Sequence, residues 1–149
     1  MRVRRFFKHG QAATELALMA PVLSLLLVGG ADFARVFYMN QEIVAAARAG
    51  AQYGSQSVTT AVDTTGIRAE ALANGANVPG IAANSSYCTC QSPAPTGQVT
   101  CATGYCKGAN SQANYVTVTT TATFTTLVNY PGIPHVTSLS GTAVMQVQD

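Results

Sequence analysis

The chain has 149 residues, of which only 9 % are charged, whereas charged residues average about 25 % in soluble globular domains. The length is enough for one modest domain and a membrane anchor, and the sparse charge disfavours a cytosolic enzyme. Half of the eight basic residues lie near the start, at Arg2, Arg4, Arg5 and Lys8. Without residues 1–10 the chain keeps four basic and six acidic side chains, a net charge of −2. A nucleic-acid partner is therefore not expected, because its binding needs a basic stripe outside this leader.

The first predicted element is a membrane segment. Leu16 to Ala31 is a run of sixteen uncharged residues between Glu15 and Asp32. A spanning helix needs about 20 residues, and residues 11–14, with Glu15 near the interface, supply the missing length. The predicted membrane part is thus residues 11–31. Because basic residues flank membrane segments on the cytoplasmic side, we expect the leader in the cytoplasm and the chain beyond Asp32 outside.

The boundary between the leader and this segment resembles the processing site of bacterial prepilins. Prepilins are cut after a Gly that follows a basic leader, and they keep a Glu at the fifth mature position. Gly10 and Glu15 stand at these positions. The resemblance implies cleavage by a prepilin peptidase between Gly10 and Gln11, and pairing of the Glu15 carboxylate with the Gln11 amine of a neighbouring subunit.

Glu15 also has a simpler interpretation. A carboxylate at membrane depth costs at least about 2.5 kcal/mol on insertion scales, which favours a charged partner. A Glu in the first turn of a helix is instead stabilised by the helix dipole, by roughly 0.3–1 kcal/mol, and reaches toward the headgroups. Two other interpretations of the N-terminus stay open, an uncleaved single-pass anchor and a secretory signal peptide ending at residues 29–31. The helical character of the residues that follow argues against the signal peptide.

A long helix is predicted over residues 11–54, roughly 65 Å at 1.5 Å per residue. Its second half is rich in Ala, the strongest helix former, and Pro21 predicts a kink in its membrane part. Ala46, Gly50 and Gly54 form a row of small residues spaced four apart. Such a row lets another element approach closely. We favour packing against the chain's own domain over packing against another subunit.

Shorter elements are predicted beyond the long helix. Residues 55–66 form a linker, with Asp63 or Thr65 as the cap of a second helix over residues 66–74. From 77 to 112 the chain is expected to be loop, because it contains three prolines and several glycines.

Two strands are predicted in the last third of the chain. Between Tyr115 and Leu127 apolar residues alternate with threonines, interrupted only by Thr120. A second strand covers residues 140–148. The two strands most simply pair antiparallel, with the helices on the apolar face. The predicted fold class is α+β: a long N-terminal transmembrane helix leads into a small extracytoplasmic domain, residues 55–149, with a short helix and an antiparallel sheet.

The chain has four cysteines, at Cys88, Cys90, Cys101 and Cys106. An even count in a loop-rich extracytoplasmic region predicts two disulfides. A Cys88–Cys90 bridge would close a very tight loop. Two connectivities stay open: Cys88–Cys101 with Cys90–Cys106, or Cys88–Cys106 with Cys90–Cys101. The spacings differ from those of zinc sites and no His lies nearby, so we expect no metal.

The sequence offers no catalytic constellation. His135, the only imidazole after the leader, follows Pro134 in a turn. No nucleophile motif, phosphate-binding loop or dinucleotide fingerprint occurs. We therefore expect a protein that is not an enzyme, with no catalytic residue and no cofactor.

Most of the chain resembles the TadE-like family of minor pseudopilins, which accompany tight-adherence (type IVb, Flp) pili. The resemblance is carried by the processed start at 11–17, the acidic-aromatic-small-Arg run at 32–38 and the Ala-rich run at 45–51. The Cys-x-Cys motif, Tyr115 to Val118 and residues 141–145 extend it into the tail. Leu16 departs from the aromatic residue that major pilins place after the Glu, and the chain is longer than a major Flp pilin. The resemblance therefore implies a minor role.

The resemblance implies a minor pilin or pilus-assembly component, structural in function and serving adhesion or secretion. Its expected partners are the membrane, a prepilin peptidase, other pilin or pseudopilin subunits and the pilus assembly machinery. The expected location is the inner membrane, with a cytoplasmic N-terminus and an extracytoplasmic C-terminal domain, and from there a surface pilus. The alternative is a single-pass anchored extracytoplasmic binding protein that enters no filament.

Overall fold

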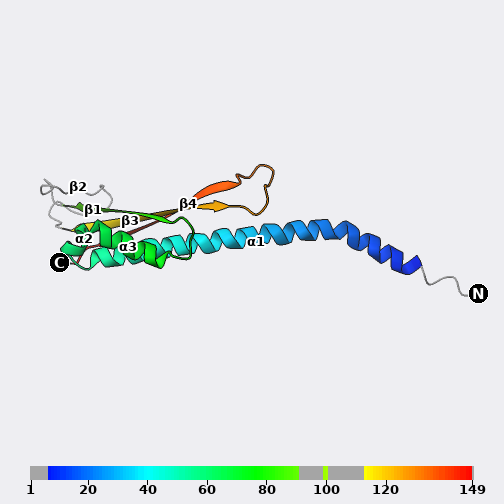
Figure 1. The fold of residues 1–149 in the computed structure, drawn as a ribbon, viewed down its shortest axis with the longest axis horizontal. Helices are drawn as coiled ribbons and strands as arrows, with labels where there is room; N and C mark the ends of the chain where they lie inside the picture. The colour runs from blue at the N-terminus through cyan, green and yellow to red at the C-terminus, as the bar shows by residue number, and fades with distance from the viewer. Residues whose placement is uncertain (1–6, 91–98, 101–112, 149) are drawn as a thin grey trace, which may run out of the picture.

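The computed structural model describes residues 7–90, 99–100 and 113–148. One long helix, α1 (Phe7–Ser55), runs the length of the molecule (Figure 1). Its C-terminal half carries a small domain, here called the head, and its N-terminal half extends away from that domain (Figure 1). The long helix predicted over residues 11–54 is confirmed and begins a turn earlier. It bends in its N-terminal part, which contains Pro21, because a Pro inside a helix removes one backbone hydrogen bond and clashes with the preceding turn.

Two short helices follow α1. In α2 (Val58–Val62), the Ser57 hydroxyl accepts from Thr60 N–H and the Thr60 hydroxyl accepts from Ser57 N–H, a reciprocal capping box. In α3 (Thr64–Asn74), the predicted cap Asp63 is confirmed, since its carboxylate accepts from Gly66 N–H at 2.9 Å. The prediction of a linker over residues 55–66 is wrong where α2 forms. The Thr and Val residues of α2 have weak helix propensity, so the capping box and burial of one Ala supply the stability.

The sheet has the strand order β2-β1-β3-β4. The strands β1 (Ala82–Thr89), β3 (Asn114–Thr125) and β4 (Val136–Gln146) are antiparallel neighbours, and the two-residue β2 (Val99–Thr100) pairs parallel to β1. Both predicted strands and their antiparallel pairing are confirmed, although β4 begins four residues before its predicted start. The prediction of continuous loop from 77 to 112 is wrong at β1. That segment lacks a clear apolar alternation, and its strand conformation comes from hydrogen bonding along the edge of β3.

The helices cover one face of the sheet, as predicted (Figure 1). The core between the two layers is thin, with Ile67, Val116 and Val118 among its largest buried side chains. Thr120, which breaks the apolar alternation of β3, is fully buried, and its hydroxyl donates to the Ile43 carbonyl of α1 at 2.7 Å. A buried hydroxyl needs such a partner, so this bond explains why Thr is tolerated there.

Small residues set the distance between α1 and the head. A Cβ atom on Gly50 would lie 3.0 Å from the Ala71 Cβ, and one on Gly54 would lie 2.9 Å from the Ile67 Cδ1. Gly141 of β4 lets the sheet approach the backbone of α1 at Val44. The row of small residues on α1 therefore packs against the chain's own domain, which confirms the favoured interpretation.

Candidate functional site at the anchor and its junction with the head

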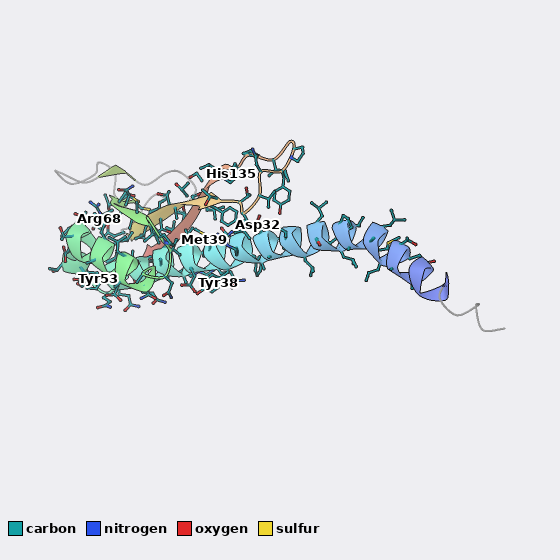
Figure 2. The ribbon with its side chains drawn as sticks, turned by 45° about the vertical axis from the view of Figure 1, so that its right-hand side comes forward. Asp32, Tyr38, Met39, Tyr53, Arg68 and His135 are labelled. Atoms are coloured by element: carbon teal, nitrogen blue, oxygen red, sulfur yellow. The ribbon has the colours of Figure 1, made fainter. Side chains whose placement is uncertain are left out.

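The N-terminal half of α1 is an exposed apolar rod. It is the one helix in the described part of the chain that is long and apolar enough to cross a membrane. Its large side chains, such as Leu18 and Leu27, are about three-quarters exposed. Figure 2 shows side chains projecting from the helix, with no other drawn element beside its N-terminal end. A helix that is apolar all round is stable in lipid or inside a larger assembly, not in water.

The predicted processing site lies inside α1. Gly10 is exposed, and a Cβ atom there would meet nothing within 4 Å. Because α1 begins at Phe7, Glu15 lies two turns into the helix, and the first turn holds no acidic residue. The helix dipole acts mainly within the first turn. The simpler interpretation of Glu15 therefore does not apply to the uncleaved chain, and would apply only to a chain that begins at Gln11.

Asp32 forms the junction between the rod and the head. It is buried although it directly follows the uncharged run. Its carboxylate accepts the Leu127 N–H on both oxygens, at 3.1 and 2.9 Å, and the Tyr130 hydroxyl at 3.3 Å. Arg35, one turn further along α1, donates to it at 2.9 Å and also lies over the Phe124 ring, 5.3 Å from its centroid. A buried carboxylate with this many donors is satisfied, and it fastens the β3–β4 connection to α1.

The β3–β4 connection, residues 126–135, is here called the tip. Thr126 closes it, because its N–H donates to the His135 carbonyl at 3.0 Å and its hydroxyl lies 2.8 Å from the His135 Nδ1. Gly132 turns the chain with a φ of 82°, a conformation that favours glycine. Burial, and then the Asp32 carboxylate, raise the pKa of Tyr130. Figure 2 shows Asp32 on α1 beside the tip and His135 within it.

The sequence pointed to Arg35 only as part of a run that resembles a family, and to Asp32 also as the charge that ends the uncharged run. It gave no sign of Tyr130 or of the Leu127 N–H, since these groups meet Asp32 from almost a hundred residues away. The one available signal was an acidic residue at the end of a membrane segment, where a charge needs compensation.

Two of the four cysteines lie in the described residues. Cys88 belongs to β1 and Cys90 follows it, and both are disulfide-bonded in the structure. Cys101 and Cys106 lie outside the described residues. The pairing of the four therefore stays a prediction, with the same two connectivities.

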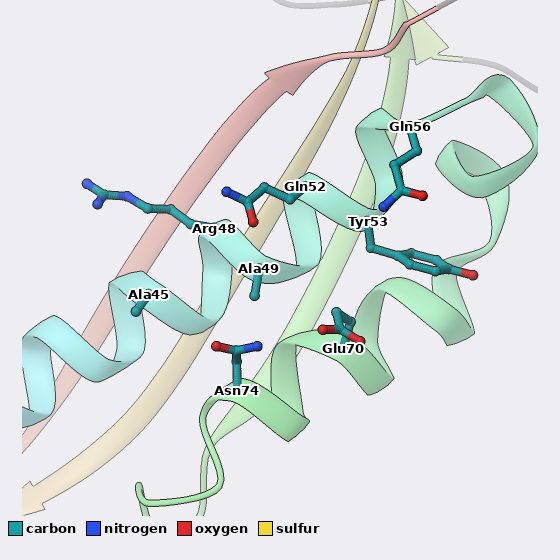
Figure 3. Close-up of a pocket in the computed structure, with 8 residues that line it drawn as sticks. All are labelled: Ala45, Arg48, Ala49, Gln52, Tyr53, Gln56, Glu70 and Asn74. Carbon is teal, nitrogen blue, oxygen red and sulfur yellow. The ribbon is translucent and has the colours of Figure 1, made fainter.

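A shallow groove of about 440 Å³ lies between α1 and α3 (Figure 3). Arg48 and Gln52 line it from α1, and Glu70 and Asn74 line it from α3. The described residues contain no group of three or more His, Cys, Asp or Glu that could hold a metal ion. The groove presents amide and charged side chains, which suit contact with a polar surface.

At one end of the groove, the Tyr53 hydroxyl donates to Asp63 at 3.1 Å. The Gly66 N–H and this hydroxyl hold the pKa of Asp63 below its usual range, and Asp63 in turn raises the pKa of Tyr53. The pair connects the end of α1 to the start of α3 and so fixes the walls of the groove.

An exposed apolar rod, continuous with the helix that carries a small α+β head, fits a protein held in a membrane by a single helix. Residues 10–52 match the family model described as TadE-like protein. The match covers α1 from Gly10 almost to its end, including Glu15, Asp32 and Arg35, and confirms the resemblance over this segment. The matched segment thus relates this part of the chain to a family that accompanies tight-adherence pili. No curated protein and no solved structure matches the chain.

Proposed function

We propose that the protein is a minor pilin or pilus-assembly component of a tight-adherence pilus, processed after Gly10 and held in the inner membrane with its head outside. The observation that carries this proposal is the free N-terminal half of α1 (Figure 1). A rod that is apolar on every side fits lipid first and the helical interior of a filament afterwards, with the same side chains buried in both places. The head then lies at the outer surface.

The proposed subunit contact involves the first turn of the mature helix. Cleavage after Gly10 creates a positive amine at Gln11, near the depth of Glu15. Pairing Glu15 with the Gln11 amine of a neighbouring subunit neutralises two charges that would otherwise face lipid, where an unpaired carboxylate costs at least about 2.5 kcal/mol. The match to the TadE-like family over this segment supports the proposal.

The mature N-terminus tests the processing step. Intact-mass measurement of protein extracted from membranes should give the mass of a chain that begins at Gln11. A retained Met1 would contradict the prepilin interpretation and favour an uncleaved anchor.

Exchange of Glu15 tests the subunit contact. Glu15→Gln should leave membrane insertion intact but abolish recovery of the protein with other pilus subunits in sheared pili. Glu42→Gln is the matched control, because it removes the same charge from the part of α1 beyond the membrane. Leader cleavage is measured for both variants by intact mass. Wild-type recovery of cleaved Glu15→Gln would show that the carboxylate has no role in subunit pairing.

The placement of the head outside the membrane is tested through its cysteines. Protein recovered from its native compartment should resist alkylation until a reductant is added, because all four thiols are expected to be paired. Four freely alkylated thiols without reductant would contradict both the disulfides and the extracytoplasmic placement.

An anchored binding protein outside any filament is the second candidate, and the groove between α1 and α3 favours it (Figure 3). Under this function, a Glu70→Lys exchange in the groove abolishes capture of a partner, whereas sheared pili contain none of the protein. Under the first function the protein is found in the pilus fraction.

A further inference from the structure

The tip carries apolar side chains that the head leaves uncovered. Leu127 is 59 % exposed, and Val128 and Ile133 are similarly exposed. Residues 126–135 include no Asp, Glu, Lys or Arg, and His135 is their one imidazole. A loop in water is usually polar, so an uncharged loop with several exposed large apolar side chains marks a contact surface.

The position of the tip identifies what it contacts. Asp32 binds the Leu127 N–H and the Tyr130 hydroxyl, and Asp32 is the residue directly after the uncharged run that ends at Ala31. The tip is therefore held at the level where α1 leaves the membrane. Figure 1 shows that it also points along α1 toward the N-terminal half of the helix, and not away from it.

The exposed apolar surface of the membrane segment continues to this level. Phe33, next to Asp32, is 74 % exposed, so the apolar surface of α1 does not end at Ala31. Apolar side chains of membrane-associated segments settle about 5–10 Å into the boundary between headgroups and acyl chains. Aromatic side chains with a polar end, such as Tyr130, are enriched at the same level.

We propose that the tip is a second membrane contact, in which Leu127, Val128 and Ile133 insert into the outer interface of the lipid bilayer beside α1. The junction at Asp32 makes this insertion possible, because it turns the backbone of the tip toward α1 and satisfies the carboxylate internally. The head is thus connected to the membrane through α1 and contacts it a second time through the tip. The proposal rests on α1 crossing the membrane, and does not depend on entry into a filament.

The chain contains no Trp, so a single introduced Trp reports on one position without background. The full-length protein carrying Leu127→Trp is reconstituted at a low protein-to-lipid ratio in phosphatidylcholine vesicles with bromine atoms placed either near the headgroups or near the chain ends. Bromine quenches the fluorescence of a Trp that it contacts. Val62→Trp is the matched control, since Val62 is 55 % exposed but lies on α2 at the far end of the head. Leu23→Trp reports on the membrane part of α1 itself.

We expect Leu127→Trp to be quenched, more strongly by bromines near the headgroups than by those near the chain ends, and Val62→Trp to be unaffected by either lipid. Leu23→Trp should be quenched more strongly by the deep bromines. Ile133→Trp provides a second position in the tip in case the first exchange disturbs the Asp32 junction.

Quenching of Leu23→Trp together with tip variants that behave like Val62→Trp would overturn the proposal while leaving the membrane crossing intact. Absence of quenching at Leu23 would instead reject the membrane crossing on which both proposals depend. A tip that is shielded from aqueous acrylamide only at high protein-to-lipid ratios, without lipid quenching, would show that a second copy covers it, and would also overturn the proposal.

Discussion

Replacing Gly141 with Ala should separate the sheet from α1. A Cβ atom at this position would lie 2.9 Å from the Val44 Cα and 3.0 Å from the Val44 N. These are main-chain atoms of a helix, so they cannot rotate aside as the end of a side chain can. Overpacking costs about 1–3 kcal/mol, and we expect a value in the upper half of that range. The loss of chain entropy in the unfolded state acts in the opposite direction, by about 0.4–1 kcal/mol.

The net destabilisation should therefore be about 2 kcal/mol. For a domain of roughly 100 residues, 1 kcal/mol lowers the Tm by about 4–8 °C, so the Tm of the head should fall by on the order of 10 °C. The assay is thermal unfolding in detergent micelles followed by near-UV circular dichroism of the tyrosines, because the membrane part of α1 stays helical in micelles. Ser140→Ala is the control, since Ser140 is the exposed neighbour on β4. A Tm for Gly141→Ala at or above the wild-type value would refute the close approach of β4 to α1.

Asp32→Ala should release the tip, because the Leu127 N–H loses both acceptor oxygens, and a hydrogen bond to a charged group contributes about 1.5–3 kcal/mol. Amide hydrogen exchange at Leu127 should accelerate while exchange at Val118 in the centre of β3 stays unchanged, and equal rates at Leu127 in both proteins would contradict the role of Asp32. Asp63, whose pKa is lowered by Gly66 N–H and Tyr53, stabilises the folded state above its unfolded pKa, and this contribution is lost as the pH falls through its folded pKa. Asp63→Asn keeps a capping acceptor but should give a Tm that depends less on pH between neutral and strongly acidic solution; an unchanged pH dependence would show that other carboxylates govern acid unfolding.

The elements that the sequence predicted are those with a strong local signal. A short stretch of sequence is enough to predict α1 from its many Ala residues and β3 from its alternation of Val with Thr. β1 has no such signal, because its residues 82–89 become a strand through pairing with β3. The same holds for α2, where the decisive contacts are the capping box at Ser57 and the burial of Ala61.

The sequence alone indicates one part of the junction between α1 and the tip. Asp32 stood out as a charge at the edge of a membrane segment, but its strongest partner is a main-chain N–H, and every residue except Pro has one. The sequence placed Leu127 at the end of the strand predicted over 115–127, whereas β3 ends at Thr125, and nothing local indicates that Leu127 is held against a helix. Only the fold brings residue 127 to residue 32.

The contacts that hold α1 to the sheet also constrain how the chain folds. Thr120 bonds to Ile43 across 77 residues, and Leu127 bonds to Asp32 across 95. Contacts of such high sequence separation close late, because the loop entropy is lost before the contact forms. During this interval the face of α1 that packs against the sheet is uncovered, and it carries one large apolar side chain, Ile43, beside the small residues Ala46, Ala47, Gly50, Ala51 and Gly54. Apart from Ile43, this face exposes little apolar area to other unfolded chains, so the small residues that permit tight packing in the native state also limit aggregation before that state is reached.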